Sequence, residues 1–255
     1  MTPALRVEWL KFRRSPVVMV ATVLMAVLLP AMGLGIFSVA STEAVGPMAA
    51  KVQGLLIGEG WNAYLGGVAQ IAAAAVFVGA GVVAAWTFGR EHADRTFPSL
   101  FALAVSRSSI ASAKFVILAC WVFGLAIAVG LVSTVVGIAG AVGEAGGTEL
   151  AAPALRLMFV VAATGVLATA AGYVASVGRG YLPAIGAIIV VVAIAQISVL
   201  FGAGGWFPFA VPGLVAITGS EAAPSLSVAQ VVLVPVVALA VMWLTVRWWD
   251  RAEVA

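Results

Sequence analysis

Six long apolar stretches divide this 255-residue chain, and a membrane-spanning helix needs about 20 such residues. The stretches are continuous instead of alternating, which favours helices over the strands of a β-barrel. The chain is 64% hydrophobic and 9% charged, whereas soluble domains are about 25% charged. We therefore predict an all-α polytopic membrane protein. Residues 1–255 form a single transmembrane domain, with spans at about 17–40, 63–88, 115–142, 153–177, 182–202 and 227–245.

The basic residues predict how these spans are oriented. Cytoplasmic loops of membrane proteins carry an excess of Lys and Arg. Six spans place both chain ends on one side, and an N-in/C-in topology leaves only Lys51 and Arg156, of the 13 Lys and Arg residues, outside. The richness in Ala, Val and Gly is typical of a GC-rich bacterial genome, so we expect a bacterial cytoplasmic membrane. Orientation explains the net charge of +3, and no nucleic-acid binding is inferred from it.

Two further segments are expected to lie against the membrane without crossing it. Residues 2–14 predict a basic interfacial helix, with Leu5, Trp9 and Phe12 on one face. A flexible basic leader is the alternative. Residues 203–226 are apolar but interrupted by Gly and Pro, which is typical of an outside re-entrant segment whose backbone is buried against protein.

The longest polar interval, residues 89–114, separates the second and third spans. Basic residues lie at both of its ends, so it is expected in the cytoplasm. In its middle, the piece from Phe97 to Val105 is amphipathic, with Thr96 placed to cap a short helix and Pro98 in the first turn. A short helix held between two spans is well placed to receive force from a partner. We predict that it docks on a separate ATPase.

The charged residues around this helix allow more than one interpretation. His92 lies between Glu91 and Asp94, and we interpret it as a solvated loop residue. Glu91 is placed to pair with Arg95 four residues later. Such a pair would stiffen the bend between the second span and the short helix.

The chemistry of an enzyme is missing from the sequence. No G-x-x-x-x-G-K-[ST] motif for ATP phosphates occurs, and neither H-E-x-x-H nor G-x-S-x-G is present. A single His and a single Cys exclude a His cluster or a multi-Cys zinc site. No ionised group falls well inside a predicted span. Gln70 and Gln196 do, and they either line a substrate route or form hydrogen bonds between helices.

The central stretch resembles the permease subunits of type-2 ABC exporters. After the second span these proteins typically have an acidic residue, a Gly-Thr-like start, a short Leu-rich helix, a Pro-Val-Ser-Arg-like exit and a Lys that opens the third span. The residues that match here are Glu91, Thr96, Leu100 to Val105, Ser106-Arg107 and Lys114. The segment E-W-L-K-F-R-R before the first span and the broken segment before the sixth are also similar. Arg95 stands where Gly is usual, Ala104 where Pro is usual, and Pro98 is additional.

The resemblance implies a pair of such permeases, identical or paralogous, working with two cytoplasmic ABC ATPase subunits. ATP and Mg would be bound by those ATPases, and no cofactor by this chain. The residues that would couple the permease to its ATPase are Glu91, Thr96, Phe97, Leu100, Phe101 and Arg107. Family cargoes include drugs, antibiotics, peptides and lipid-linked glycans, and apolar walls favour a hydrophobic or amphipathic cargo. The alternatives are a membrane immunity or sensor subunit that only binds a partner, and an intramembrane enzyme, which the missing reactive groups disfavour.

Overall fold

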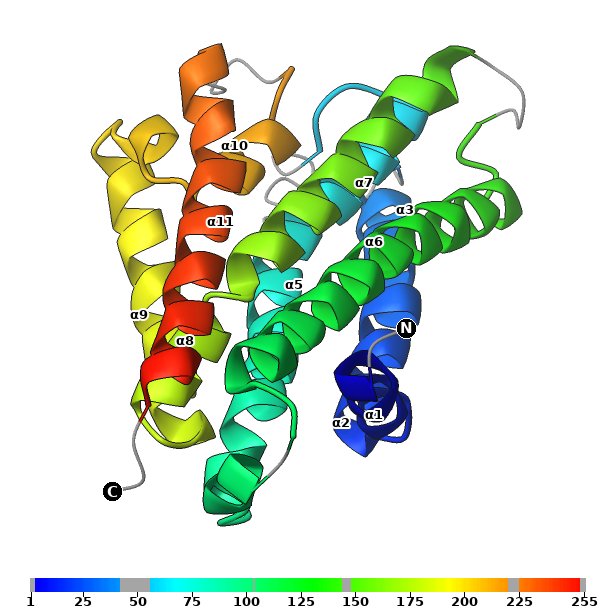
Figure 1. The fold of residues 1–255 in the computed structure, drawn as a ribbon. Helices are drawn as coiled ribbons and strands as arrows, with labels where there is room; N and C mark the ends of the chain where they lie inside the picture. The colour runs from blue at the N-terminus through cyan, green and yellow to red at the C-terminus, as the bar shows by residue number, and fades with distance from the viewer. Residues whose placement is uncertain (1–2, 42–55, 103, 144–147, 220–224, 253–255) are drawn as a thin grey trace.

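The computed structural model describes residues 3–41, 56–102, 104–143, 148–219 and 225–252 (Figure 1). Within these ranges the chain forms helices and their connections, and no strand. Six helical segments are long and apolar enough to cross a membrane. The predicted all-α polytopic fold is thereby confirmed, while the side of the membrane on which each loop lies remains a prediction.

Each of the six long segments overlaps one predicted span, although the third begins before its predicted start and the sixth continues beyond its predicted end. The first consists of α2 (Pro16–Val23), the π-helical turn η1 (Leu24–Leu28) and α3 (Leu29–Ser41). The others are α5 (Gly60–Ala93), α6 (Arg107–Ala139), α7 (Thr148–Ala168) with α8 (Ala171–Val177), α9 (Tyr181–Leu200) and α11 (Val228–Arg251). Shorter helices are α1 (Pro3–Arg13), η2 (Phe97–Ala102), η3 (Gly204–Trp206) and α10 (Val211–Ala216).

Helix α5 lies at the centre of the bundle, and α3, α7, α8, α9 and α10 pack around it (Figure 1). Its sequence is rich in Ala and Gly, which lets neighbouring backbones approach closely where lipid supplies no hydrophobic drive for helix association. At Gly89, an added Cβ would lie 3.0 Å from the carbonyl carbon of Gly180 and 3.0 Å from the nitrogen of Tyr181. The turn between α8 and α9 therefore sits directly on the end of α5.

Two of the long segments are distorted, each for a local reason. Pro30 has no N–H to donate to the preceding turn, and the π-helical turn η1 ends immediately before that region. In the fourth segment, a break at Thr169 and Ala170 separates α7 from α8. The Thr169 hydroxyl donates to the Val166 carbonyl at 2.6 Å, a local bond that competes with the helical pattern.

The Gly- and Pro-interrupted segment after α9 folds back into the bundle. It forms η3 and α10, and α10 packs on α5 and α7 with Val211, Pro212, Leu214 and Ala216 buried. Burial of this backbone against protein is what an irregular segment at membrane depth requires. Residues 220–224, part of the predicted re-entrant segment, lie outside the described ranges.

Candidate functional site

Four parts of the chain meet at one end of the bundle. They are α1, the last turns of α5, the first turns of α6 and the end of α11. Ser106 begins α6 as its N-cap, and its hydroxyl accepts a hydrogen bond from the Ser109 N–H. The loop between α5 and α6, which contains η2, crosses this end. It is the loop that the sequence assigns to a partner.

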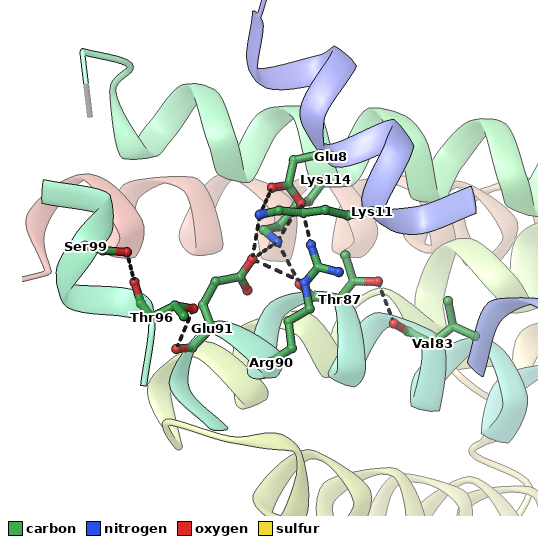
Figure 2. A network of polar contacts seen from close by, with 9 residues as sticks. All are labelled: Glu8, Lys11, Val83, Thr87, Arg90, Glu91, Thr96, Ser99 and Lys114. Carbon is green, nitrogen blue, oxygen red and sulfur yellow. Dashed lines mark hydrogen bonds and ion pairs between the residues drawn. The ribbon is translucent and has the colours of Figure 1, made fainter. Parts of the chain in front are cut away.

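Lys114 is the centre of a buried charge network, drawn in Figure 2. Its Nζ donates to Glu8 Oε2 at 2.8 Å, to Glu91 Oε1 at 2.7 Å and to the Thr87 carbonyl at 2.8 Å. The Lys114 side chain is 0% exposed, and those of Glu8 and Glu91 are 5% and 3% exposed. All three ammonium protons therefore have a partner, which a fully buried Lys requires. The network joins α1, α5 and α6.

Two more cations border the buried carboxylates. Lys11 Nζ lies 2.9 Å from Glu8 Oε1, and Arg90 lies 3.4 Å from both Glu8 Oε2 and Glu91 Oε1. Burial by itself raises the pKa of the Glu8 carboxyl. The charges of Lys114 and Lys11 and their hydrogen bonds together outweigh that effect, so the Glu8 pKa lies below its ordinary value. Glu8 is thus held in its ionised form.

Aromatic side chains attach η2 to α11. Phe97 is buried and stacks on the His92 ring, with centroids 4.2 Å apart. The Phe97 ring also lies edge-on to the Trp249 ring, with centroids 5.5 Å apart. Trp249 Nε1 in turn donates a hydrogen bond to the Ser176 hydroxyl at 2.9 Å. One side chain of the loop thereby contacts the ends of both α5 and α11.

Arg107 makes the second connection to α11. Its guanidinium donates to the Asp250 carbonyl at 2.8 Å and also to the Ala252 carbonyl. These carbonyls belong to the end of α11, where the helix dipole favours a positive charge. The start of α6 is therefore fastened to the chain's last helix.

The opposite face of the loop points away from the bundle. Asp94, Arg95, Thr96, Pro98 and Ser99 are all exposed. The loop thus has an inner face fixed to four helices and an outer face that is open.

Most of the predicted coupling residues belong to the inner face. Glu91, Phe97 and Leu100 are buried, Arg107 contacts α11, and Thr96 is exposed. Phe101 lies in η2, and its side chain is outside the described part of the structure. The structure does not test their role in coupling, which stays a prediction.

Several local predictions were wrong, for physical reasons. The short helix is a six-residue 3₁₀ turn, whose repeat of three puts Phe97 and Leu100 on the same side. The Thr96 hydroxyl donates back to the Glu91 carbonyl at 3.4 Å instead of capping η2. Glu91 pairs with Lys114 and Arg90, not with Arg95, which is exposed with a φ of 56°.

His92 also differs from expectation. His92 lies within α5 and stacks on Phe97, so it is not a solvated loop residue. Helix α1 packs through Ala4, Glu8 and Phe12, while Trp9, predicted to share a face with Leu5 and Phe12, is 43% exposed.

Sequence reasoning missed Glu8 and Arg90 as members of the site and did not foresee the burial of Lys114. One signal was present: Glu8 is the sole acidic residue of a basic helix, spaced by four from both Ala4 and Phe12. That spacing places the Glu8 carboxylate between Ala4 and Phe12 on one helix face, whose other side chains are apolar and suited to packing against protein.

Gln70 and Gln196 border a second feature, a cavity of about 300 Å³ between α5, α9 and the segment around α10. Its walls are mainly apolar and include Phe77 and Phe209, whose rings meet edge-on at 5.7 Å. The two amides, far apart in sequence, thus share one cavity.

These features define an all-α, multi-pass membrane protein. More narrowly, the chain belongs to the ABC-2 transporter family: the model of the family described as ABC-2 family transporter protein matches residues 4–196. The matched region runs from α1 into α9 and includes the whole charge network. Permeases of this family generally work with an ATPase subunit. None of the curated proteins matches the chain.

Proposed function

We propose that this chain is the membrane subunit of an ATP-driven exporter in a bacterial cytoplasmic membrane, with a separate ABC ATPase docked on the loop between α5 and α6. The observation that carries the proposal is the double attachment of that loop. Its ends are joined to α1 through Glu8 and Lys114, and to α11 through Phe97 and Arg107.

These attachments support a route for force. A push on η2 reaches α5 and α6 directly through the chain. It reaches α1 through ion pairs and α11 through aromatic contacts and the Arg107 hydrogen bonds. Because packed interfaces shift between discrete arrangements and do not deform continuously, a displaced loop moves these helices together.

The outer face of the loop is the proposed docking surface. Arg95, Pro98 and Ser99 are exposed there, whereas the buried residues are already engaged. An ATPase that binds this surface would therefore contact different residues from those that transmit the movement. In this proposal the outer face binds the ATPase, and the inner face transmits its movement to the helices.

The cavity beside Gln70 supports a hydrophobic or amphipathic cargo. Mainly apolar walls with a few polar groups are typical of sites that hold such molecules. Exposed apolar residues on α9 and α11, such as Leu182, Leu200 and Val228, also leave broad faces for lipid or for a second permease copy. We propose a pair of permeases, identical or paralogous, in the working exporter.

The proposal is tested by co-expressing the chain with the ATPase encoded beside it. In the variant Arg95→Glu, which alters the outer face, we expect the ATPase to be lost on purification. In Phe97→Ala, which alters the inner face, we expect the ATPase to remain bound while its stimulation by the permease falls at least tenfold. Equal behaviour of the two variants would contradict the separation of docking from coupling.

A transport measurement separates an exporter from a sensor subunit. Inside-out vesicles that contain the complex should accumulate a lipophilic dye when ATP is added, and Gln70→Leu or Gln196→Leu should change which dyes are taken up. A complex that binds the ATPase, shows no cargo-stimulated hydrolysis and moves no dye would instead be the partner-binding subunit.

A further inference from the structure

A second groove lies at the charged end of the bundle, away from the Gln70 cavity. It has a volume of about 370 Å³ and is formed by α1, α2 and α6. Trp9 and Arg13 border it on α1, Met19 and Val23 on α2, and Cys120 on α6. From these residues we infer that the groove binds one anionic phospholipid. The inference stands apart from the export proposal, because it requires only that the chain lies in a bilayer.

The floor of the groove is built before any ligand arrives. Phe12 is buried and meets the Trp121 ring edge-on at 6.0 Å. Trp121 Nε1 donates to the Thr22 hydroxyl at 2.9 Å, and that hydroxyl donates to the Val18 carbonyl at 2.6 Å. The polar atoms of the floor are thus satisfied by protein, which leaves an apolar surface suited to an acyl chain.

The dimensions of the groove fit one leaflet. From Ser15, the N-cap of α2, to Val23 the helix advances about 12 Å at about 1.5 Å per residue. One leaflet of a bilayer contributes about 15 Å of hydrocarbon. A lipid with its headgroup beside Arg13 would therefore lay its acyl chain along Met19 and Val23 toward the bilayer centre.

Charge decides which lipid is preferred. Arg13 is exposed at the mouth of the groove and makes no ion pair with a carboxylate in the described ranges. The neighbouring Arg14 is exposed as well, while Glu8, the one acidic residue of α1, is turned inward onto Lys114. An exposed guanidinium with no internal counter-charge complements a lipid phosphate, and an interfacial Trp beside it suits the headgroup level.

Comparison with the other apolar groove supports this choice. A larger groove of about 960 Å³ runs between α2, α3 and α5, and none of the described residues that line it is charged. The larger groove therefore has no charged side chain to bind a lipid headgroup. The groove beside Arg13 combines an apolar floor with a cation at the level of the lipid phosphate.

The test is native mass spectrometry of the full chain in detergent, with phosphatidylglycerol and phosphatidylcholine added in equal amounts. The wild type should retain phosphatidylglycerol about fivefold more than phosphatidylcholine, the preference expected from one basic group near an anionic headgroup. Arg13→Gln should remove that preference. Arg251→Gln changes an exposed Arg at the same end of the bundle but outside the groove, and should leave it intact. Equal retention of both lipids by the wild type, or an unchanged preference in Arg13→Gln, would overturn the proposal.

Crosslinking of the wild-type chain gives a result that does not depend on any variant folding. Phosphatidylglycerol with a photoreactive acyl chain should label peptides that contain Met19 or Cys120. Labelling confined to the larger groove overturns the assignment. Oxidative crosslinking of Cys120 between two copies would also overturn it, because the groove would then be an interface between permeases.

Discussion

At the scale of single residues, Lys114 is the side chain on which the charged end of the bundle depends. It is fully buried, and two carboxylates and a carbonyl surround its ammonium group. A buried ion pair contributes little against a well-packed apolar replacement, but removing one partner leaves a buried charge without compensation. Without Lys114, Glu8 and Glu91 would each lose their nearest cation, and only Lys11 and Arg90 at the border of the network would remain beside them.

Replacement of Lys114 by Met should therefore destabilise the chain by about 3–5 kcal/mol, the range for a broken buried pair. The matched control is Lys11→Met, because Lys11 contacts the same Glu8 but is 38% exposed. Solvent screens that pair, so the control should cost at most about 1 kcal/mol. Unfolding in detergent micelles would measure both. Equal losses would show that the buried position of Lys114 is not decisive.

Glu8 predicts a pH dependence. Its pKa in the folded chain lies below the ordinary value of 4.5. As the pH falls, Glu8 is therefore protonated in the unfolded chain before it is protonated in the folded chain. The stability that Glu8 contributes is fully present above its unfolded-state pKa and is lost as the pH falls through its folded-state pKa. In Glu8→Gln this acid-dependent part of the stability should disappear. Glu149→Gln, at an exposed position, should keep the wild-type pH profile. Profiles of unfolding temperature against pH provide the comparison.

At the scale of helices, the end of α5 is held by backbone contact as well as by charge. Gly89 lies against the turn between α8 and α9, only one residue before Arg90 enters the network. A displaced turn would therefore shift the charged residues too.

Gly89→Ala should destabilise the chain by about 1–3 kcal/mol, since its new methyl group would press on backbone atoms that have little room to move. Gly124→Ala on α6 is the control, because nothing lies within 4 Å of an added Cβ there. That change should be neutral or stabilise by up to about 1 kcal/mol through higher helix propensity. Thermal unfolding of the two variants tests the contact. A neutral Gly89→Ala would mean that the turn is able to move.

The long helices could be predicted from sequence, whereas the form and exact position of their interruptions could not. Continuous apolar runs specify that a segment spans a membrane, since length and composition suffice. The π-helical turn before Pro30 and the break at Thr169 depend on local hydrogen bonds, which hydrophobicity does not report. The six-residue η2 is shorter than predicted, because its boundaries follow from the contacts of Phe97 with α5 and α11.

At the scale of the whole molecule, the arrangement constrains the topology. The end of α11 contacts the start of α6 through Arg107, and α1 contacts the same helix through Lys114. Both terminal elements therefore lie at the same end of the bundle as the loop that contains η2. Arg156, at the other end, binds Asn62 and Thr218.

Accessibility of introduced cysteines measures this arrangement. In a Cys120→Ser background, Arg95→Cys and Arg251→Cys should react with a membrane-impermeant maleimide only in inside-out vesicles. Glu149→Cys should react only in right-side-out vesicles. Labelling of all three from one side would contradict a six-span topology with both ends in the cytoplasm.

The location of the candidate site could be predicted, but not its construction. The basic residues predicted where the loop lies, and Glu91 and Arg107 make contacts at that end of the bundle, while their role in coupling stays a prediction. Glu8 could not be assigned from one sequence, because its partner Lys114 lies 106 residues away and nothing local indicates the pairing. Long-range contacts of this kind require the three-dimensional arrangement of the helices.

The distance in sequence between Glu8 and Lys114 also sets the order in which these parts of the chain assemble during synthesis. Helix α1 leaves the ribosome before α6, so Glu8 finds its partner only after α6 has been made and inserted. Until then Glu8 lacks the Lys114 partner that joins α1 to α6. Formation of the Glu8–Lys114 pair thus marks the point at which the first three membrane segments have come together, so the beginning of the chain is among the last parts of its N-terminal half to be locked in position.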